Sequence, residues 1–546
     1  MMMMSHYDNT DSSDFRLHEK NSCRSPLLRS RNRRWRHSRI GTAVVMVAAL
    51  LLSTTVWLSV VFSATTCHFW IRVREWEGSP RSRSHFHTHN HRHSLPWIST
   101  PPPPPPSPSP NRSLSLSEEK QEELSLKHIV FGIAGSSHLW KRRKEFVRLW
   151  WLPNLMRGHV WLEDNYKLQK GQGDDSLQLP PIMVSEDISR FRYTNPTGHP
   201  SGLRISRIVI ECFRLGLPNV RWFVLADDDT IFNSDNLVAV LSKYDPTEMV
   251  YIGTPSESHS ANTYFSHSMA FGGGGIAISY PLAEALSNIH DDCIDRYPKL
   301  YGSDDRLHAC ITELGIPLTV EPGFHQWDIR GNAHGLLSSH PIAPFVSIHH
   351  VEAVDPFYPG LTSLDSLKLF TKAMRADPRS FLQRSICYDL AGHFTLVVSL
   401  GYVVQVFPNI VLPRDLDRSE KTYTAWNRLS HRNEFDFDTR DPHRSICKKP
   451  VLFFFKDVKR HGNATVGSYA RATGKDYLKR KVLCFPRSPP LNHVKNIQVL
   501  GFPLRKNWHL VPRRLCCKIN QSSDAILKLT VGQCRKGALS SVTDSV

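Results

Sequence analysis

The feature that most constrains the fold is a short apolar run that ends in three consecutive carboxylates. Residues 221–226 read Arg-Trp-Phe-Val-Leu-Ala, and Asp227, Asp228 and Asp229 follow directly. A continuous apolar run this short is typical of a buried strand in a parallel sheet. Such a strand delivers its last residues to the carboxyl edge of the sheet, where open α/β sheets bind ligands. The pattern therefore predicts an α/β fold with an acidic site at the end of this strand.

Three adjacent acids repel one another unless a cation neutralises them. Their oxygens suit a hard divalent ion such as Mg²⁺ or Mn²⁺, with substrate phosphates in the remaining positions. Next along the chain, residues 233–235 can cap a helix whose apolar face carries Leu237, Val238 and Leu241. Strand, acidic turn and helix together indicate a metal–diphosphate site. A solvated acidic turn without a ligand would explain the same residues, and both interpretations stand at this point.

The N-terminal part of the chain has the composition of a membrane anchor. Much of the formal net charge of +18 comes early, with a dense arginine block at residues 29–39, and residues 40–62 hold no charged side chain. The uncharged span is long enough to cross a bilayer. By the positive-inside rule we expect residues 1–39 to be a cytosolic basic tail, residues 40–62 a transmembrane signal anchor, and the rest lumenal. No nucleic-acid-binding motif accompanies the charge, so we expect no nucleic-acid partner.

Residues 63–125 are expected to be a low-complexity lumenal stem. They hold a histidine-rich run at residues 85–93 and six consecutive prolines at residues 101–106, which form a semi-rigid spacer. The histidines could bind a transition metal, although a solvated stem needs no such role. N-glycosylation acceptor sequences begin at Asn111, Asn463 and Asn520, all on the side predicted to be lumenal.

The globular part begins near residue 126 with alternating strand and helix patterns. Residues 128–135 form an apolar run that ends in small residues, and a helical pattern over residues 140–151 follows, with Lys141, Arg142 and Arg143 in its first turn. These cations could receive a diphosphate, or the segment could be an ordinary βα unit. Further strands are predicted at residues 180–184 and 249–253, with a helix at residues 205–215; these are indicated by apolar periodicity.

Two later segments carry residues that could serve a reaction. Gly272–Gly275 lies between apolar runs, where it permits close approach of a ligand to the backbone or marks a bulge in a strand. Residues 303–315 predict a helix with Ser303 as its N-cap and Asp304 and Asp305 in its first turn. Acids in a first turn complement the helix dipole without any further role, and the same dipole would keep a general base ionised.

A last strand is predicted at residues 345–352. Alternation places Val346, Ile348 and His350 on one face and Ser347 and His349 on the other. If the polar face looks into the cleft, His349 is the better metal-ligand candidate, whereas a structural histidine would fit the same pattern.

The order and spacing of these motifs resemble the Fringe-like β-1,3-glycosyltransferases, in particular the plant Fringe-related proteins long catalogued as a domain of unknown function. The resemblance covers residues 126–534. It is carried by six motifs: the strand with Trp222 and Asp227–Asp229, Gly272–Gly275, Tyr301–Asp305, Gly323–Gln326, His340-Pro341 and Val346–His350.

This resemblance implies a GT-A fold over residues 126–355 and a β-rich C-terminal extension over residues 356–546. It also implies a divalent metal, usually Mn²⁺, a UDP-sugar donor, inversion at the anomeric carbon, a glycan or glycoprotein acceptor, and a Golgi membrane location as a single-pass type II protein. The implied site residues are Asp229, Asp227 and His349 for the metal, Asp227, Asp228, Gly273 and Gly274 for the cofactor, and Asp305, with Asp304 as its rival, for the catalytic base. The helix continues with Arg306-Leu307-His308 instead of the valine-rich, glycine-containing sequence of many animal members, so the resemblance does not define the acceptor.

Several expectations concern what surrounds the site. Trp222, Phe271 and Trp327 are expected to enclose the cleft. Residues 324–328 are expected on the acceptor side, although His325 and Gln326 could equally be structural. In an oxidising compartment, Cys293 and Cys310 are expected to pair, since they bracket Asp305 and would brace its helix.

The C-terminal region and two other functions remain to be considered. Residues 394–400 and 402–406 are expected to form a pair of strands. A catalytically silent protein that binds sugars or proteins through the same cleft is the main alternative function. A metal phosphohydrolase is disfavoured, because the histidine and acid clusters of two-metal sites are missing around Asp227.

Overall fold

The computed structural model describes residues 122–164, 177–426, 434–484, 490–520 and 525–539. The predicted cytosolic tail, the predicted signal anchor and the predicted stem up to residue 121 lie outside the described residues. Within these ranges, no helix has the length and the apolar character needed to span a bilayer.

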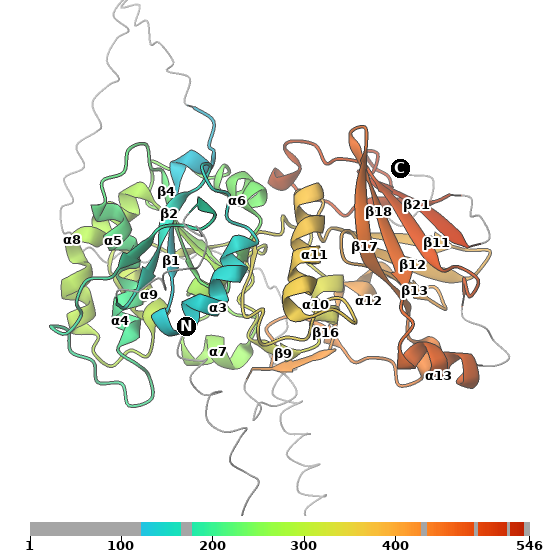
Figure 1. Ribbon diagram of the computed structural model, residues 1–546, viewed down its shortest axis with the longest axis horizontal. Coiled ribbons are helices and arrows are strands. Elements are labelled where there is room, and N and C mark those ends of the chain that lie inside the picture. The colour runs from blue at the N-terminus through green and yellow to red at the C-terminus, as the bar shows by residue number, and fades with distance from the viewer. Residues whose placement is uncertain (1–121, 165–176, 427–433, 485–489, 521–524, 540–546) are drawn as a thin grey trace, which may run out of the picture. The chain divides into compact units, whose positions relative to one another are not determined.

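The first half of the described chain is built on a seven-stranded sheet (Figure 1). Its strands, in spatial order, are β3 (Ile182–Val184), β2 (Arg157–Leu162), β1 (Ile129–Ala134), β4 (Trp222–Asp227), β7 (Ile276–Ser279), β6 (Tyr251–Gly253) and β8 (Leu318–Val320). β1 runs parallel to both β2 and β4, and its register places Ala134 beside Asp227. β7 runs antiparallel to β4 and β6. The predicted α/β class is confirmed. β4 lies parallel to β1 on one side, as predicted, but antiparallel to β7 on the other, so the sheet is mixed.

Helices cover both faces of this sheet. They are α3 (Ser137–Arg148), α4 (Ser201–Ser206), α5 (Ile208–Arg214), α6 (Ser234–Leu241), α8 (Tyr280–Arg296) and α9 (Ser303–Glu313). The short helix α7 (His259–Tyr264) packs instead beside Met269 and Phe271. In β4, Trp222 and Val224 pack in the core with α3 and α6, whereas Phe223 and Leu225 pack with α5, α8 and α9. A strand buried on both faces needs apolar side chains at every position, which explains the continuous apolar run.

The helix predicted at residues 205–215 is interrupted at Arg207, which separates α4 from α5. Its guanidinium is fully buried and pairs with Glu186 and Asp291, which the local sequence pattern does not indicate. By contrast, the predicted start of α6 is confirmed, because the Asn233 side chain accepts a hydrogen bond from the backbone N–H of Asn236.

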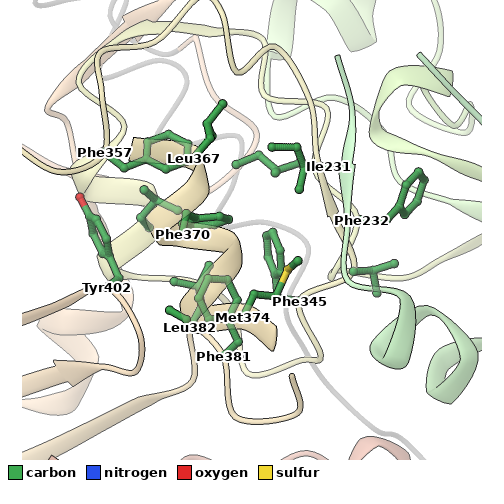
Figure 2. Packing of buried hydrophobic residues seen from close by; sticks show 14 of the residues in the cluster. Ile231, Phe232, Phe345, Phe357, Leu367, Phe370, Met374, Phe381, Leu382 and Tyr402 are labelled. Carbon is green, nitrogen blue, oxygen red and sulfur yellow. The ribbon is translucent and has the colours of Figure 1, made fainter. Parts of the chain in front are cut away.

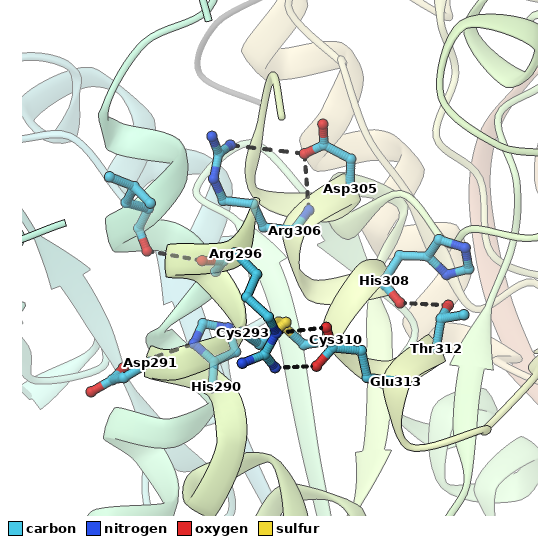
Figure 3. Close-up of a disulfide and its surroundings, with 12 residues drawn as sticks. His290, Asp291, Cys293, Arg296, Asp305, Arg306, His308, Cys310, Thr312 and Glu313 are labelled. Carbon is cyan, nitrogen blue, oxygen red and sulfur yellow. Dashed lines mark hydrogen bonds and ion pairs between the residues drawn. A yellow bond between two sulfur atoms is a disulfide. The ribbon is translucent and has the colours of Figure 1, made fainter. Parts of the chain in front are cut away.

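A disulfide between Cys293 of α8 and Cys310 of α9 ties these two helices together (Figure 3). This confirms the pairing predicted from the sequence. Further disulfides join Cys387 to Cys517, Cys447 to Cys484 and Cys516 to Cys534. Among the cysteines in the described ranges, Cys212 is free and buried.

The C-terminal part carries an eight-stranded sheet. In spatial order its strands are β11 (Arg384–Asp389), β12 (Phe394–Ser399), β13 (Val403–Phe407), β17 (Val451–His461), β18 (Ala464–Arg471), β19 (Asn496–Gly501), β21 (Ile526–Gly532) and β20 (Cys516–Ile519). β12 and β13 form the predicted antiparallel pair. Gly401, at φ +78°, lies in the turn between them, where its lack of a Cβ relieves the strain.

Smaller elements lie outside the two large sheets. The short strand pairs are β10 (Ser347–Ile348) with β5 (Ile231–Phe232), β15 (Tyr423–Ala425) with β9 (Ile329–Gly331), and β14 (Ser419–Glu420) with β16 (Thr439–Arg440). The remaining helices are η2 (Leu126–His128), η4 (Gly272–Gly274), α10 (His334–Ser338), α11 (Ser363–Ala376), α12 (Pro413–Asp417), η5 (Ile446–Lys448), α13 (Lys475–Leu483) and η6 (Trp508–Leu510).

Helix α11 shares one hydrophobic core with residues from both sheets (Figure 2). The ring of Phe370 on α11 lies 5.8 Å from that of Phe345 and 4.8 Å from that of Phe381, measured between centroids. A hydrogen bond joins the same two parts: Asn236 of α6 donates to the carbonyl of Pro378, just after α11, at 2.9 Å. The C-terminal region is therefore part of the structure that supports the first sheet.

Candidate functional site

The acidic turn after β4 is fixed to the glycine run. The Thr230 hydroxyl donates a hydrogen bond to the carbonyl of Gly273 at 2.8 Å, and the backbone N–H of Asp227 donates to the same hydroxyl at 3.1 Å. Asp227, Asp228 and Asp229 are all buried. Three carboxylates are thus held at the carboxyl edge of the sheet.

His349 meets two of these carboxylates because β10 pairs with β5, the strand that directly follows the acidic turn. Its Nε2 lies 3.2 Å from Oδ1 of Asp229 and 3.5 Å from Oδ2 of Asp227. One ligand atom from each of the three residues lies within 4.8 Å of the others. On the opposite side of the ring, Nδ1 faces the carbonyl of Gln326 at 3.3 Å. A proton on Nδ1 leaves Nε2 as the ligand atom, an arrangement common around metal-bound histidines.

The charges within this cluster are strongly coupled. Burial alone would lower the pKa of His349, but the carboxylates of Asp229 and Asp227 outweigh it and raise this pKa to about 10. Burial would raise the pKa of Asp229, yet His349 and Arg143 hold it well below its usual range.

The donor set fits a divalent cation. Among the described residues, the buried Oδ1 atom of Asp229 accepts no hydrogen bond. Two carboxylates and one imidazole offer oxygen and nitrogen ligands that suit ions such as Mn²⁺.

Asp228 faces a different neighbour, Arg143 of α3. The guanidinium lies 2.8 Å from Oδ1 of Asp228 and 3.1 Å from both Oδ2 of Asp229 and Oε2 of Glu352. Burial raises the pKa of Asp228 to about 7, although Arg143 opposes the rise. The sequence singled out Arg143 only as one of three cations that could receive a phosphate. In the structure it neutralises the acidic turn.

Gly273 and Gly274 are buried, and both glycines make backbone hydrogen bonds inside the protein. Besides the contact of Gly273 with Thr230, the N–H of Gly274 donates to Oε1 of Gln326 at 2.9 Å and its carbonyl accepts from the Ser347 hydroxyl. A Cβ added at Gly274 would lie 3.1 Å from the backbone nitrogen of Gln326, so close packing accounts for this glycine. Their predicted contact with a cofactor stays a prediction.

Asp304 and Asp305 both lie in the first turn of α9 and line a small cavity of about 30 Å³, together with Gln326 and His350. The expectation that Ser303 is the N-cap is wrong, because Gly302 takes that position and the helix begins at Ser303.

The two acids differ in their hydrogen bonds. Asp305 accepts from the backbone N–H groups of Tyr301 at 2.7 Å and Gly302 at 2.9 Å, and burial raises its pKa despite these bonds. Asp304 accepts from the Ser303 hydroxyl at 3.1 Å, and burial together with the nearby Asp227 carboxylate raises its pKa to about 6. Figure 3 shows Asp305 next to Arg306 at the start of the helix.

Strand alternation is the wrong reason for choosing His349 over His350. β10 ends at Ile348, and His350 has a φ of +55°, so both imidazoles lie near the site. His350 Nδ1 is 3.3 Å from Oδ1 of Asp328, and its ring stacks on Trp426 with centroids 4.2 Å apart. The β10–β5 pairing, a non-local contact, decides which imidazole reaches the carboxylates.

The expectation that three aromatics enclose the cleft is only partly met. Trp222 lies in the core at the opposite end of β4 from the acids, because it begins the strand that Asp227 ends. Phe271 does line the small cavity. Trp327 lines a separate cavity of about 880 Å³, where its backbone N–H donates to Oε2 of Glu257 at 2.7 Å. Nothing in the local sequence indicates the roles of Glu257 or Trp426.

Comparisons with known proteins find one family of unknown function and, over shorter segments, β-1,3-glycosyltransferases. Residues 261–517 match the family model described as "Protein of unknown function, DUF604". A β-1,3-glucosyltransferase of Mus musculus is 32% identical over 107 residues, which are 20% of this chain and 21% of the relative. The β-1,3-N-acetylglucosaminyltransferase radical fringe of Gallus gallus is 24% identical over 180 residues, which are 31% of this chain and 45% of the relative. The matched segments thus span less than half of either relative.

Likeness to solved structures is weak. Mouse xyloside xylosyltransferase 1 matches 36% of this chain and 85% of its own at 11% identity, with a TM-score of 0.24, which supports no conclusion about the fold. The chain is therefore similar to a family without an assigned function and, over shorter segments, to β-1,3-glycosyltransferases.

Proposed function

We propose that this protein is a metal-dependent, inverting glycosyltransferase with a GT-A-like domain, which transfers a sugar from a UDP-sugar to a hydroxyl of a glycan or glycoprotein, forming a β-1,3 linkage. The observation that carries the proposal is the buried cluster of Asp227, Asp229 and His349 at the carboxyl edge of the sheet. The similarity to β-1,3-glycosyltransferases supports both the reaction class and the linkage.

In this proposal the chain provides a preorganised cation site, and the cation in turn binds the diphosphate. Mn²⁺ or another divalent cation held by Asp229, Asp227 and His349 would neutralise the diphosphate that leaves as UDP. Arg143 holds the acidic turn in place, and the carbonyl of Gln326 orients the His349 ring. The nucleotide would lie beside the acidic turn and the glycine run, which are held in place by Asp228, Gly273 and Gly274.

Asp305 is proposed as the catalytic base, with Asp304 as its rival. The base accepts the proton of the acceptor hydroxyl while that oxygen bonds to the anomeric carbon. The bond between the anomeric carbon and the diphosphate breaks at the same time, and attack from the opposite face inverts the configuration. Burial raises the pKa of both acids, which favours proton acceptance near neutral pH.

The enzyme is proposed to act in the Golgi lumen, anchored by residues 40–62. Four disulfides among the described cysteines support an oxidising compartment. The arginine-rich residues 29–39 support the orientation.

A second candidate function is sugar or protein binding without catalysis. Both carboxylate oxygens of Asp305 accept backbone hydrogen bonds, as a purely structural helix cap would. If Asp304 is also only structural, the cleft binds its ligand and no transfer occurs.

The test is UDP release by the purified full-length chain, measured across a panel of UDP-sugars with and without Mn²⁺. We expect release with at least one donor, only in the presence of metal, and its loss in His349→Ala. Calorimetric titration of UDP runs in parallel. Mn²⁺-dependent UDP binding without release from any donor would favour the binding protein, and the absence of both would overturn the proposed function.

A further inference from the structure

A second group of possible metal ligands lies outside the candidate active site. His259 and His267, on α7 and in the turn that follows it, face Asp436 from the C-terminal part of the chain. His259 Nδ1 is 2.5 Å from Oδ1 of Asp436, and His267 Nε2 is 3.3 Å from its Oδ2. One ligand atom from each residue lies within 4.8 Å of the others, and all three residues are exposed. An ion from solution can therefore reach them.

The backbone around this group is held in place without any ion. Asp436 Oδ2 accepts a hydrogen bond from Nδ2 of Asn262 at 2.8 Å. Two residues earlier, Glu434 accepts from the Ser258 hydroxyl at 2.7 Å with its side chain and from the His259 N–H at 2.5 Å with its carbonyl. Segments more than 160 residues apart in sequence are thus locked together beside the three donor groups.

We propose that His259, His267 and Asp436 bind one Zn²⁺ ion, with water in the fourth position. Two imidazoles and one carboxylate are a donor set that zinc accepts in sites of this open kind. With metal–ligand distances of about 2.0–2.2 Å, the ligand atoms of a tetrahedral site lie about 3.4 Å apart. The 3.3 Å separation between Nε2 of His267 and Oδ2 of Asp436 is close to this value. His259 Nδ1 faces the other carboxylate oxygen, Oδ1, so the exposed His259 side chain has to shift for both imidazoles to share one ion.

The second nitrogen of His259 supports the same assignment. Nε2 lies 3.4 Å from the Thr263 hydroxyl, one turn further along α7. A proton on Nε2 that is donated to this hydroxyl leaves Nδ1 free for the metal, and a ring oriented by such a partner is usual for metal-bound histidines.

This site differs from the buried cluster around Asp229 in both composition and place. Its two imidazoles favour zinc over Mg²⁺ or Mn²⁺, which prefer oxygen donors. His267 and Asp436 also line the cavity of about 880 Å³. Zinc would therefore fasten the segment around Asp436 to α7 at the edge of that cavity, whether or not the proposed transferase activity is correct.

The test is zinc stoichiometry of the full-length chain, measured by equilibrium dialysis followed by metal analysis. The parent for all variants carries asparagine in place of His85, His87, His89, His91 and His93, so that this histidine run does not contribute. His267→Ala and Asp436→Asn remove one ligand each. His461→Ala, which changes an exposed histidine at the end of β17, is the matched control.

Each ligand variant is expected to bind one zinc equivalent less than the parent, and His461→Ala the same number as the parent. Zinc bound at Asp227, Asp229 and His349 is common to all variants and cancels in the difference. Zinc should also raise the melting temperature of the parent and the control more than that of the ligand variants. Without metal, similar melting temperatures will show that all variants fold. Equal zinc stoichiometry in the parent and the ligand variants would overturn the proposal and leave only contacts between the two histidines and Asp436.

Discussion

At the scale of single residues, the candidate site depends on groups that need not touch a ligand. Arg143 binds Asp228, Asp229 and Glu352 at once, so one buried cation neutralises several acids. The carbonyl of Gln326 selects the His349 tautomer, and its side chain receives the N–H of Gly274. The acids therefore keep their positions while their mutual repulsion is reduced.

The two acids at the start of α9 give the sharpest prediction at this scale. If Asp305 is the base, Asp305→Asn should lower kcat by about two to four orders of magnitude, because the amide accepts no proton. Asp305 also caps α9 with both oxygens, so the variant should lose about 1 kcal/mol of stability through one impaired hydrogen bond. Initial-rate kinetics, thermal unfolding and UDP titration separate these effects, since UDP affinity should stay near that of the parent. An active Asp305→Asn and an inactive Asp304→Asn would move the assignment to Asp304.

Removing Arg143 should destabilise the folded chain strongly. Arg143→Met leaves Asp228, Asp229 and Glu352 without their shared partner, and breaking a buried ion pair in this way costs about 3–5 kcal/mol. Arg142→Met is the matched control, because Arg142 also contacts Glu352 but its side chain is 66% exposed, and exposed pairs contribute only about 0–1 kcal/mol. Urea unfolding of both variants measures the difference. Equal stabilities would mean that Arg143 does not compensate the acidic turn.

At the scale of elements, a helix or strand could be predicted from the sequence when its cause lies in neighbouring residues. The apolar run of β4 follows from burial on both faces, and the cap at Asn233 follows from its neighbours. The break between α4 and α5 depends on distant partners of Arg207, and no local pattern shows it. The long helix α8 was not predicted, although Pro281 in its first turn is a residue that often begins helices.

The same distinction applies to the candidate site. The sequence pointed to Asp227, Asp229 and His349, which the structure brings together, but the direction of Asp228 toward Arg143 is a tertiary contact. Alternation assigns side chains to faces only within a strand. β10 ends at Ile348, so alternation does not assign the faces of His349 and His350.

The α8–α9 disulfide should stabilise both the fold and the helix that carries Asp305. The double variant Cys293→Ala/Cys310→Ala opens a crosslink between residues 17 positions apart, which is expected to cost about 3 kcal/mol. Chemical unfolding under non-reducing conditions measures this loss. We also expect lower kcat, since α9 is less firmly held. Cys212→Ala, at the free buried cysteine, serves as a comparison that leaves the crosslink intact. Unchanged stability of the double variant would show that the packing of α8 on α9 suffices.

At the scale of the whole molecule, the described chain places its largest apolar cluster where α11 meets both sheets. Phe345 comes from the segment that leads into His349, whereas Phe370 and Phe381 belong to the C-terminal part. The packing of this core therefore extends to the segment that carries His349. A C-terminal region attached in this way supports the site through the core.

The last prediction is that this shared core makes the two sheets unfold together. Phe370 is fully buried, so Phe370→Ala should cost about 3–5 kcal/mol. Thermal unfolding should remain one transition, with loss of Mn²⁺-dependent UDP binding and loss of far-UV signal at the same lowered temperature. Leu390→Ala is the control, because this side chain is 78% exposed and its loss should leave the transition unchanged. If UDP binding persisted beyond a separate first transition in Phe370→Ala, the seven-stranded sheet would be independently stable. The C-terminal region would then be a neighbour that the site does not need.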